Sequence, residues 1–275
     1  MTQKRAGVLG HPIANSLSPA LHKAAYEHLG LDWSYTYYDV TTETLPQFLQ
    51  AMDSTWAGLS LTMPLKLDVI PLLDHVDPFA KLLGSVNTVL VQPAPKTVLL
   101  VGANTDVAGL VSAIEPLVGR PASAAVIGGG ATARSAVAAL AQLGCRNPRI
   151  HVRSIGRSGP LIRVGYKMEL DLQMAKLDSL AESVKTCDIV IATTPVDAHE
   201  SLIELLSETA PRATLLDVVY APDPTPLVAW WRTYAPAHTG LAMLVYQAAE
   251  QVRLMTSRDV DPQILADAVN LTLPG

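Results

Sequence analysis

The chain has 275 residues, which predicts one large domain or two ordinary ones with room for a sizeable core. Hydrophobic residues make up 49% of the chain and charged residues only 16%, a balance that excludes a disordered protein. The formal net charge of −5 offers no basic field for a phosphate backbone, so we expect no nucleic-acid partner.

The sequence predicts neither a membrane anchor nor an export signal. No apolar run reaches the roughly 18 residues of a membrane span, and Gly10 and Pro12 interrupt the N-terminal segment before a signal-peptide core could develop. Cys145 and Cys187 fit no disulfide or metal framework, so we expect two buried thiols. The expected location is the cytoplasm.

In the first hundred residues, apolar strand patterns alternate with helical ones, which predicts an α/β protein with parallel sheets. The predicted strands are 6–10, 33–40 and 58–62, and the predicted helices are 19–30 and 44–52. The stretch 67–84 has a helical pattern that Pro71 and Pro78 should divide into two pieces. Two further strands, 85–92 and 96–106, should flank a turn at Pro93–Pro95.

A second unit is expected from about residue 107. The stretch 122–130 is predicted to be a strand that runs into glycines, and the alanine-rich stretch 131–144 a helix that Gly144 ends. The other strands predicted in this unit are 149–153, 188–195 and 214–220. The amphipathic stretch 240–255 should pack back on the first unit.

The loop GGGATA follows the first strand of this second unit and fits the G-x-G-x-x-G/A pattern of dinucleotide sites. Gly128 allows a tight turn, Gly130 lets the backbone approach a pyrophosphate, and Ala133 keeps the helix close to the strand. The free N–H groups of the helix would then bind the anion. The predicted cofactor loop comprises Gly128, Gly129, Gly130, Ala131, Thr132 and Ala133. A glycine turn of purely steric origin is the alternative.

The end of the next predicted strand indicates which dinucleotide would bind. An NAD site has an acidic residue about 20 residues after the glycine loop, where it accepts the ribose hydroxyls. Here Arg153, Ser154 and Arg157 stand at that place. Guanidinium groups suit the 2′-phosphate of NADP, so NADP is the predicted cofactor, with a solvated basic turn as the alternative.

Polar residues also follow the predicted strands of the first unit, where a substrate could lie. The segment NSLSP places two hydroxyls before a helix start, which suits a substrate carboxylate or hydroxyl, or simple helix capping. Singly, each of these residues has an ordinary explanation as a surface charge or a turn. The set comprises Ser16, Ser18, Thr62, Lys66, Asn87, Asn104 and Asp106.

Taken together and in order, these segments resemble the shikimate dehydrogenase family from end to end. The family pattern runs G-x-P-x-x-H-S-x-S-P, N-V-T-x-P-x-K, V-N-T, N-T-D, a glycine-rich NADP loop, N-R-T, D-x-x-Y-x-P-x-x-T and G-x-x-M-L-x-x-Q. The matching segments here are GHPIANSLSP, SLTMPLK, VNT, NTD, GGGATARS, VRS, DVVYAPDPT and GLAMLVYQ.

The resemblance implies reversible, NADP-dependent reduction of 3-dehydroshikimate to shikimate, a step of aromatic amino-acid biosynthesis. Ser16 and Ser18 would bind the substrate carboxylate. The ring hydroxyls would be held by Thr62, Asn87 and Gln247, with Tyr220 close by. Met243 would lie against the nicotinamide, and Lys66 and Asp106 would form the catalytic pair.

The resemblance gives Lys66 a chemical purpose. Hydride addition to a ketone produces an alkoxide, so a proton must reach the oxygen. We expect Lys66 to donate that proton in reduction and to accept it in oxidation, with Asp106 orienting the ammonium and keeping it charged. Because two coupled groups titrate jointly, the sequence leaves open which of the two carries the mobile proton. A hydride donor needs no metal, and no metal is expected. Structural or surface roles are expected for His11, His22, His75 and His151, and packing for the doublet Trp230–Trp231.

Six positions depart from the family pattern. They are Asn15, Ser60, Val107, Ala131, Val152 and Ala242. All of them spare the catalytic pair, and they put in doubt the fine substrate preference and the grip on the cofactor around Val152.

The predicted fold has two α/β domains separated by a cleft. Residues 1–106 form the substrate domain, completed by C-terminal helices from 240–275, and residues 107–239 form a Rossmann-type NADP domain. A quinate/shikimate dehydrogenase that prefers NAD and a non-catalytic NADP-binding sensor are the alternatives. The partner is a small molecule, and the oligomeric state stays open, with a homodimer among the options.

Overall fold

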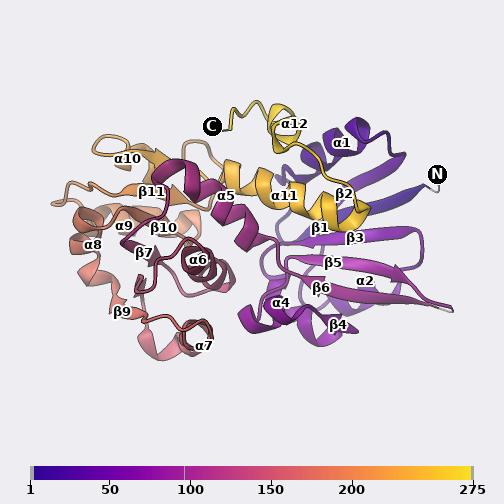
Figure 1. Cartoon of the computed structure of the whole chain (residues 1–275), viewed down its shortest axis with the longest axis horizontal. Coiled ribbons are helices and arrows are strands. Elements are labelled where there is room, and N and C mark those ends of the chain that lie inside the picture. Colours follow the sequence, from indigo (N-terminus) through magenta and orange to yellow (C-terminus); the bar gives the residue numbers. More distant parts are fainter. Residues whose placement is uncertain (1–2, 96, 274–275) are drawn as a thin grey trace. The chain divides into compact units, whose positions relative to one another are not determined.

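The computed structural model describes residues 3–95 and 97–273, so Lys96 of the predicted strand 96–106 lies outside the described residues. The chain forms two compact units (Figure 1). One comprises the residues up to Gly109 together with Leu244–Leu273, and the other comprises Leu110–Met243. The transitions fall inside helices α5 (Asp106–Val118) and α11 (Leu241–Thr256). Assignment of one unit to the substrate and the other to NADP stays a prediction.

The described part of the first unit contains a mixed six-stranded sheet in the order β2-β1-β3-β5-β6-β4. Its strands are β1 (Lys4–Gly10), β2 (Trp33–Asp39), β3 (Trp56–Leu61), β4 (His75–Val76), β5 (Thr88–Pro93) and β6 (Val98–Ala103). The predicted parallel pairing holds for β1 with β2 and β3 and for β4 with β6, whereas β5 runs antiparallel to both β3 and β6. The reason is the short connection after β5, because two strands joined by a tight turn can pair only in antiparallel fashion.

The stretch 67–84 is more broken than the predicted two helical pieces. It contains the end of α3 (Leu65–Asp68), a 3₁₀ turn η1 (Ile70–Leu72), strand β4 and helix α4 (Pro78–Leu83). Pro71 lies inside η1, and Pro78 begins α4 behind Asp77, whose carboxylate accepts hydrogen bonds from the N–H groups of Phe79 and Ala80. Proline and the helix cap at Asp77 both interrupt a continuous helix here. Strand β4 was not predicted, because two residues are too few to show an alternating pattern.

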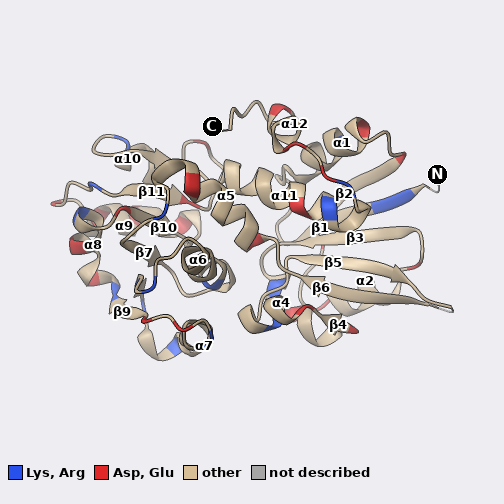
Figure 2. Ribbon diagram, in the orientation of Figure 1, with Lys and Arg blue, Asp and Glu red and all other residues tan. Residues whose placement is uncertain are grey.

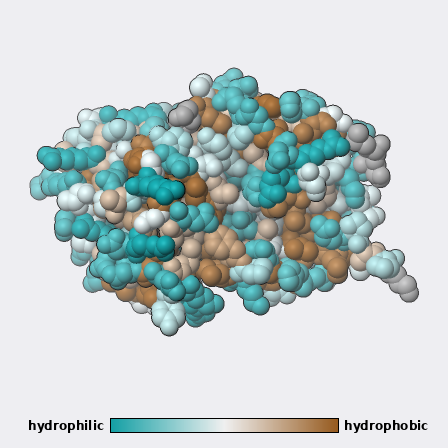
Figure 3. Space-filling model, viewed as in Figure 1, coloured by the Kyte–Doolittle hydropathy of each residue, from teal (hydrophilic) through white to brown (hydrophobic). Residues whose placement is uncertain are grey.

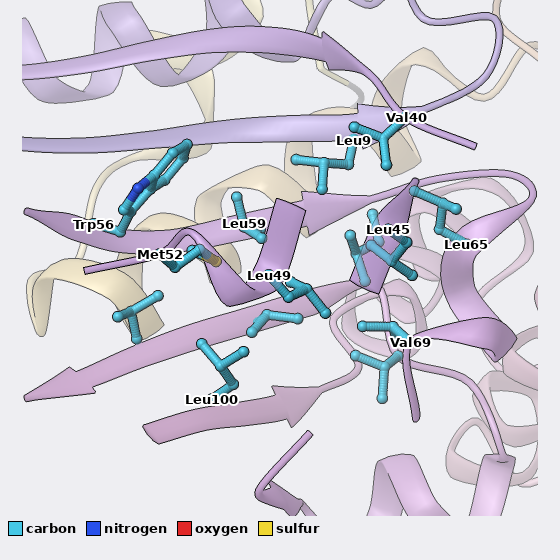
Figure 4. Packing of buried hydrophobic residues seen from close by; sticks show 14 of the residues in the cluster. Leu9, Val40, Leu45, Leu49, Met52, Trp56, Leu59, Leu65, Val69 and Leu100 are labelled. Carbon is cyan, nitrogen blue, oxygen red and sulfur yellow. The ribbon is translucent and has the colours of Figure 1, made fainter. Parts of the chain in front are cut away.

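Helices cover both faces of this sheet. On one face, α2 (Leu45–Gln50), α3 and α4 close a core to which β3 contributes Leu59 and Leu61 (Figure 4). On the other face, α1 (Ser18–His28), α11 and α12 (Pro262–Asp267) pack together through apolar side chains. The prediction that the stretch 240–255 packs back on the first unit is confirmed. Because side chains alternate along a strand, Ser60 of β3 faces the α11 layer.

The described part of the second unit contains a six-stranded sheet in which every pairing is parallel. Its strands are β7 (Ala124–Ile127), β8 (Arg149–Val152), β9 (Gln173–Lys176), β10 (Ile189–Ala192), β11 (Thr214–Asp217) and β12 (Ala237–His238). The order β9-β8-β7-β10-β11-β12 is the 3-2-1-4-5-6 order of doubly wound dinucleotide-binding sheets. Strands β9 and β12 were not predicted, since they are short and β9 is not apolar.

The helices of the second unit also lie on two faces. They are α6 (Ala131–Gln142), α7 (Gly159–Lys167), α8 (Leu180–Thr186), α9 (His199–Leu205) and α10 (Pro226–Trp231), with 3₁₀ turns η2 (Ile155–Arg157), η3 (Leu177–Ser179) and η4 (Val196–Ala198). Helices α8, α9 and α10 share one apolar cluster with β7, β10 and β11. Packing of the tryptophan doublet is confirmed, since Trp231 is fully buried in this cluster and Trp230 lies against it.

Charged and apolar side chains are mixed on the surface of both units. Figure 2 shows basic and acidic residues interspersed on helices and loops, and Figure 3 shows hydrophilic and hydrophobic residues mixed on the face in view. Among the helices of the described residues, none has the length and apolar character needed to cross a membrane.

Candidate active site

The strand directions of the first unit bring its polar motifs to one edge of the sheet. Strands β1 and β3 are parallel, so the segments that follow them leave at the same edge. Strand β5 runs the opposite way and therefore begins there, directly after Asn87, and β6 ends there. Main-chain hydrogen bonds hold the segments together, from the N–H of Thr62 to the carbonyl of Leu9 at 2.9 Å and from that of Asn87 to the carbonyl of Ala103 at 3.2 Å.

Lys66 and Asp106 meet at this edge. Lys66 lies in the short helix α3 after β3, and Asp106 is the first residue of α5 after β6. The Nζ atom of Lys66 donates to Oδ2 of Asp106 at 2.7 Å, with the two side chains 15% and 4% exposed. The ion pair is therefore largely shielded from water, while part of the lysine side chain stays accessible.

Asn87 holds the second oxygen of the Asp106 carboxylate. Its Nδ2 atom donates to Oδ1 of Asp106 at 2.8 Å. The orientation of the Asn87 amide is fixed, because its Oδ1 atom faces the main-chain N–H of Thr105 at 2.8 Å, a group that can only donate. Both carboxylate oxygens of Asp106 thus have a donor, which fixes the orientation of the carboxylate.

Gln247 of α11 joins the same group. Its Oε1 atom lies 3.4 Å from Nδ2 of Asn87 and 3.5 Å from the hydroxyl of Thr105, and its Nε2 atom donates to the carbonyl of Leu244 at 2.8 Å. The predicted residues Lys66, Asn87, Asp106 and Gln247 therefore lie together in the structure.

The two predicted carboxylate-binding serines surround the start of α1. The helix begins at Ser18, and its N-terminal cap residue, Leu17, gives no side-chain cap. The hydroxyl of Ser16 accepts a hydrogen bond from the N–H of Ser18 at 3.3 Å. Thr62 directly follows β3, and its methyl group faces Gly10, where a side chain would collide with it. These three residues lie after the ends of β1 and β3, the same edge that carries Lys66.

In the second unit, the glycine loop follows β7 and leads into α6. Gly128 has a φ of 118°, a conformation that favours glycine, and a Cβ atom there would collide with the hydroxyl of Thr193. The Thr193 hydroxyl in turn donates to the carbonyl of Ile127 at 2.8 Å. The predicted strand, glycine loop and helix are confirmed, and Ala133 is fully buried at the start of α6.

The basic segment predicted for the 2′-phosphate follows β8, the strand next to β7. Arg153, Ser154 and Arg157 are all exposed at this end of the sheet. Within residues 3–95 and 97–273, neither guanidinium group has an ion pair, so both keep their donors available.

The other two predicted residues also belong to the second unit. Tyr220 is half-buried in the loop after β11, and Met243 is buried on α11, four residues before Gln247. The first and last residues of the D-x-x-Y-x-P-x-x-T segment meet there, since the hydroxyl of Thr225 donates to Oδ2 of Asp217 at 2.6 Å. A buried hydrogen bond thus links the two ends of the segment 217–225.

The histidines and cysteines lie as predicted for structural residues. His22 and His151 are buried, and His11 is exposed beside Asp39 with 2.6 Å between Nδ1 and Oδ1. Cys145 and Cys187 are free and buried, which raises the pKa of both thiols. In the part of the chain that the structure describes, no group of three His, Cys, Asp or Glu residues could hold a metal ion.

Comparison with known proteins identifies the family. Residues 8–89 match the shikimate dehydrogenase substrate-binding domain, and residues 240–269 match the shikimate 5′-dehydrogenase C-terminal domain. The NADP-dependent shikimate dehydrogenase of Citrifermentans bemidjiense is 35% identical over 99% of this chain and 97% of its own length. The chain belongs to the shikimate dehydrogenase family.

Solved structures of shikimate dehydrogenases agree with this membership. The enzyme of Mycobacterium tuberculosis has a TM-score of 0.86 and 33% identity, with 97% of this chain and 99% of that chain covered. The shikimate 5-dehydrogenase of Thermus thermophilus, solved with NADP(H) and shikimate, has a TM-score of 0.79 and 31% identity, with coverages of 97% and 98%. The two-domain α/β fold predicted from the sequence is thus that of the shikimate dehydrogenase family.

The residues of the second unit fit the NADP of these relatives. A Cβ atom at Gly130 would meet no heavy atom within 4 Å, so the backbone of the loop is open on that side. The first N–H groups of α6 have no partner within the helix, and Arg153 and Arg157 add exposed cationic donors. This donor set suits a pyrophosphate and a third phosphate.

Sequence reasoning gave no role to four polar residues behind the catalytic pair, and it named only Ser60 among them, as a departure from the family pattern. Ser60, Thr88, Thr105 and Gln251 are all buried and hydrogen-bonded within the first unit. Thr88 and Thr105 lie inside motifs that the sequence did single out. Gln251 lies outside the motifs, and its only signal is a spacing of four residues from Gln247, which places both on one face of a helix.

Proposed function

We propose that Lys66 and Asp106 are the acid–base pair of the reversible, NADP-dependent reduction of 3-dehydroshikimate to shikimate. The reaction is that of the family, so the protein is an oxidoreductase of the shikimate pathway that uses NADP. The observation that carries the assignment of the pair is the 2.7 Å hydrogen bond between Nζ of Lys66 and Oδ2 of Asp106, with Asn87 on the other oxygen.

Lys66 can act on the reacting oxygen of the substrate. Its ammonium has three donors, and Asp106 accepts from one of them. A second can reach the carbonyl oxygen of the substrate and stabilise the negative charge that develops there during reduction. The proton then passes from Nζ to that oxygen, and in oxidation it returns.

Asp106 and Asn87 set the geometry of this transfer. The Asp106 carboxylate holds the Lys66 ammonium in place through the 2.7 Å hydrogen bond. Asn87 in turn hydrogen-bonds to the Asp106 carboxylate. This restricts the orientation of the Lys66 ammonium that the carboxylate accepts from. Such preorganised groups stabilise a transition state without reorganising during the reaction.

The remaining residues have binding roles in this proposal. Ser16 and Ser18 donate hydroxyl hydrogens to the substrate carboxylate, while Thr62, Asn87, Gln247 and Tyr220 bind the ring hydroxyls. NADPH supplies the hydride when it is bound, with Met243 against its nicotinamide. The phosphate contacts are assigned to the segment 128–133 and to Arg153, Ser154 and Arg157.

A direct assay tests this function against its two alternatives. The protein is mixed with shikimate or quinate and with NADP⁺ or NAD⁺, and the absorbance of the reduced nicotinamide is followed. We expect the highest kcat/KM for shikimate with NADP⁺. A higher value for quinate with NAD⁺ would indicate a quinate/shikimate dehydrogenase, and no turnover in any mixture would indicate a sensor.

The location and the oligomeric state belong to the same proposal. A cytoplasmic enzyme that works on small soluble metabolites is the expectation, and a homodimer is one of the options. Fractionation of cells and light scattering of the purified protein test these two points.

A further inference from the structure

A second layer of buried polar side chains lies behind the catalytic pair, and the proposed reaction does not use it directly. Its centre is Gln251 on α11, which is 1% exposed. Four other residues hydrogen-bond to the Gln251 side chain, and they come from α1, β3 and β5 and from the residue that precedes β5. All of these contacts lie within the first unit.

The orientation of the Gln251 amide follows from its partners. Its Nε2 atom faces the main-chain carbonyl of Asn87 at 3.2 Å, and a carbonyl can only accept a hydrogen bond. The nitrogen is therefore the donor at this end, and it also donates to the hydroxyl of Thr88 at 3.0 Å. The Oε1 atom consequently points the other way and accepts from the hydroxyl of Ser60 at 2.7 Å.

The orientation of the Gln251 amide affects Asp106 through Thr88 and Asn87. The Thr88 hydroxyl accepts from Gln251, so its own hydrogen is directed to Oδ1 of Asn87 at 2.9 Å. Oδ1 of Asn87 therefore accepts from Thr88 as well as from the main-chain N–H of Thr105, and Nδ2 of Asn87 points to Asp106 at 2.8 Å. Every link has one donor and one acceptor, and the chain of hydrogen bonds ends on the carboxylate that holds Lys66.

The far end of the chain is fixed as well. The hydroxyl of Tyr35 donates to that of Ser60 at 2.6 Å, so the Ser60 hydrogen is left for Gln251. His22 stacks on Tyr35 with 3.9 Å between ring centroids, and its Nε2 lies 3.3 Å from Oε1 of Gln251. Burial lowers the pKa of His22 to about 3, so the ring is neutral and donates from Nε2. Ser60 stands where the family pattern has Asn. In this chain the carboxamide next to that strand position is the side chain of Gln251 on α11, which accepts from the Ser60 hydroxyl.

We propose that Gln251 is a positioning residue of the reaction, which acts through Thr88 and, together with the main-chain N–H of Thr105, holds the Asn87 amide and thereby the Asp106 carboxylate and the Lys66 ammonium. The proposal rests on the assignment of Lys66 and Asp106 as the acid–base pair. It predicts that the donor at the Nε2 position of Gln251 is required for turnover, although this side chain is buried and its Nε2 atom donates to Asn87 and Thr88.

Two substitutions of Gln251 separate positioning from packing. Gln251→Glu keeps the shape but replaces the donor with an oxygen that faces the Asn87 carbonyl. A protonated glutamic acid can donate from that oxygen, whereas the carboxylate cannot, and burial raises the pKa of such a group. Gln251→Met keeps most of the volume and has no donor at any pH. Thr88→Val cuts the chain one link further on and leaves Gln251 intact.

The experiment measures kcat for shikimate with NADP⁺ between pH 6 and 10 for these three variants and the wild type. We expect Gln251→Met and Thr88→Val to lose up to about 100-fold in kcat at every pH, as for a small misplacement of a catalytic group. The ratio of Gln251→Glu to wild type should rise as the pH falls. The matched control Gln50→Glu, at an exposed position of α2, should leave kcat unchanged, and NADP⁺ affinity should stay the same in all variants.

Several outcomes would overturn the proposal. Wild-type kcat in folded Gln251→Met or Thr88→Val would show that the chain of hydrogen bonds has no influence on turnover. A constant ratio for Gln251→Glu across pH would show that the donor is not what matters. Loss of folded structure in all three variants, seen as a missing thermal transition, would make Gln251 a purely structural residue. Lys66→Ala is measured in parallel, and if it retains turnover, the acid–base assignment fails whatever the Gln251 variants do.

Discussion

The polar groups of the two units differ in burial and in origin. In the first unit they belong to residues with little exposure, such as Asn87 at 2% and Asp106 at 3%, and hydrogen bonds hold each of these two side chains. In the second unit the predicted phosphate donors are the backbone of a glycine loop and the exposed guanidinium groups of Arg153 and Arg157. The first arrangement suits chemistry that needs fixed dipoles, and the second suits a ligand that must enter and leave.

This difference predicts two kinds of response to mutation. Changes in the first unit should lower turnover, because they disturb groups that act on the substrate. Changes at the exposed donors of the second unit should lower affinity for one part of the cofactor. Buried polar groups of the second unit, such as Asp217 and Thr225, should affect stability.

The largest effect is expected for Lys66→Ala. General acid–base assistance is typically worth about 10²–10⁴-fold in rate, so kcat for shikimate should fall by about that factor. NADP⁺ affinity, measured by fluorescence titration, should barely change. Lys81→Ala, which removes an exposed lysine of α4, is the matched control and should keep wild-type turnover. Near-normal turnover of Lys66→Ala would remove Lys66 from the mechanism.

Thr225→Val should destabilise the second unit. The Thr225 hydroxyl caps α10 by accepting from the N–H of Val228 at 3.2 Å and also donates to the buried Asp217. Loss of a cap and of a donor to a buried carboxylate should together cost about 2–4 kcal/mol. Thermal unfolding of the variant should begin at a lower temperature, whereas Thr233→Val at an exposed position should not change it. An unchanged transition would mean that neither the cap nor the hydrogen bond from Thr225 to Asp217 contributes to stability.

The pH dependence of stability tests the burial of His22. Burial lowers its pKa from 6.5 to about 3, so the unfolded chain binds a proton that the folded chain does not. This contribution to stability is complete above pH 6.5 and is lost as the pH falls towards 3, by about 2 kcal/mol at pH 5. Urea unfolding at pH 7 and pH 5 should therefore show a smaller difference in His22→Gln than in the wild type. Equal differences would mean that His22 is protonated in the folded protein.

The smallest effect is expected for Arg153→Ala. One charge-assisted hydrogen bond at an exposed site should be worth about tenfold in NADP⁺ affinity. Affinity for NAD⁺, which lacks the 2′-phosphate, should stay the same. Arg163→Ala on α7 removes another exposed arginine and serves as the control. Equal losses for both cofactors would exclude a contact of Arg153 with the 2′-phosphate.

The elements of the fold that the sequence predicted are those with long, regular patterns. The glycine loop and α6 combine a strand, a turn and an alanine-rich helix in one continuous segment, so local chemistry decides them. The short turn at Pro93–Pro95 accounts for the antiparallel pairing of β5 with β6, whereas the pairing of β5 with β3 depends on strands that are distant in sequence. Strands β4 and β12 have two residues each, and their pairing depends on neighbours that are distant in sequence.

The candidate site was predictable as far as its motifs reach. Lys66, Asn87 and Asp106 stand in short segments whose order resembles the family, and the structure brings them together. Gln251 stands in none of them, and its partners His22, Ser60 and Thr88 come from distant parts of the chain. This hydrogen-bond network forms only when helix α11 packs on the folded sheet. It could therefore not be predicted from short motifs in the sequence.

The central claim is that Lys66 and Asp106 act as one unit, and a double-mutant cycle tests it most directly. We would measure kcat with shikimate and NADP⁺ for the wild type, Lys66→Ala, Asp106→Asn and the double variant at one pH. Groups that act as a unit are strongly non-additive, so the double variant should lose no more than the worse of the two single variants. Losses that multiply in the double variant would show that the two residues act independently and would contradict the proposed pair.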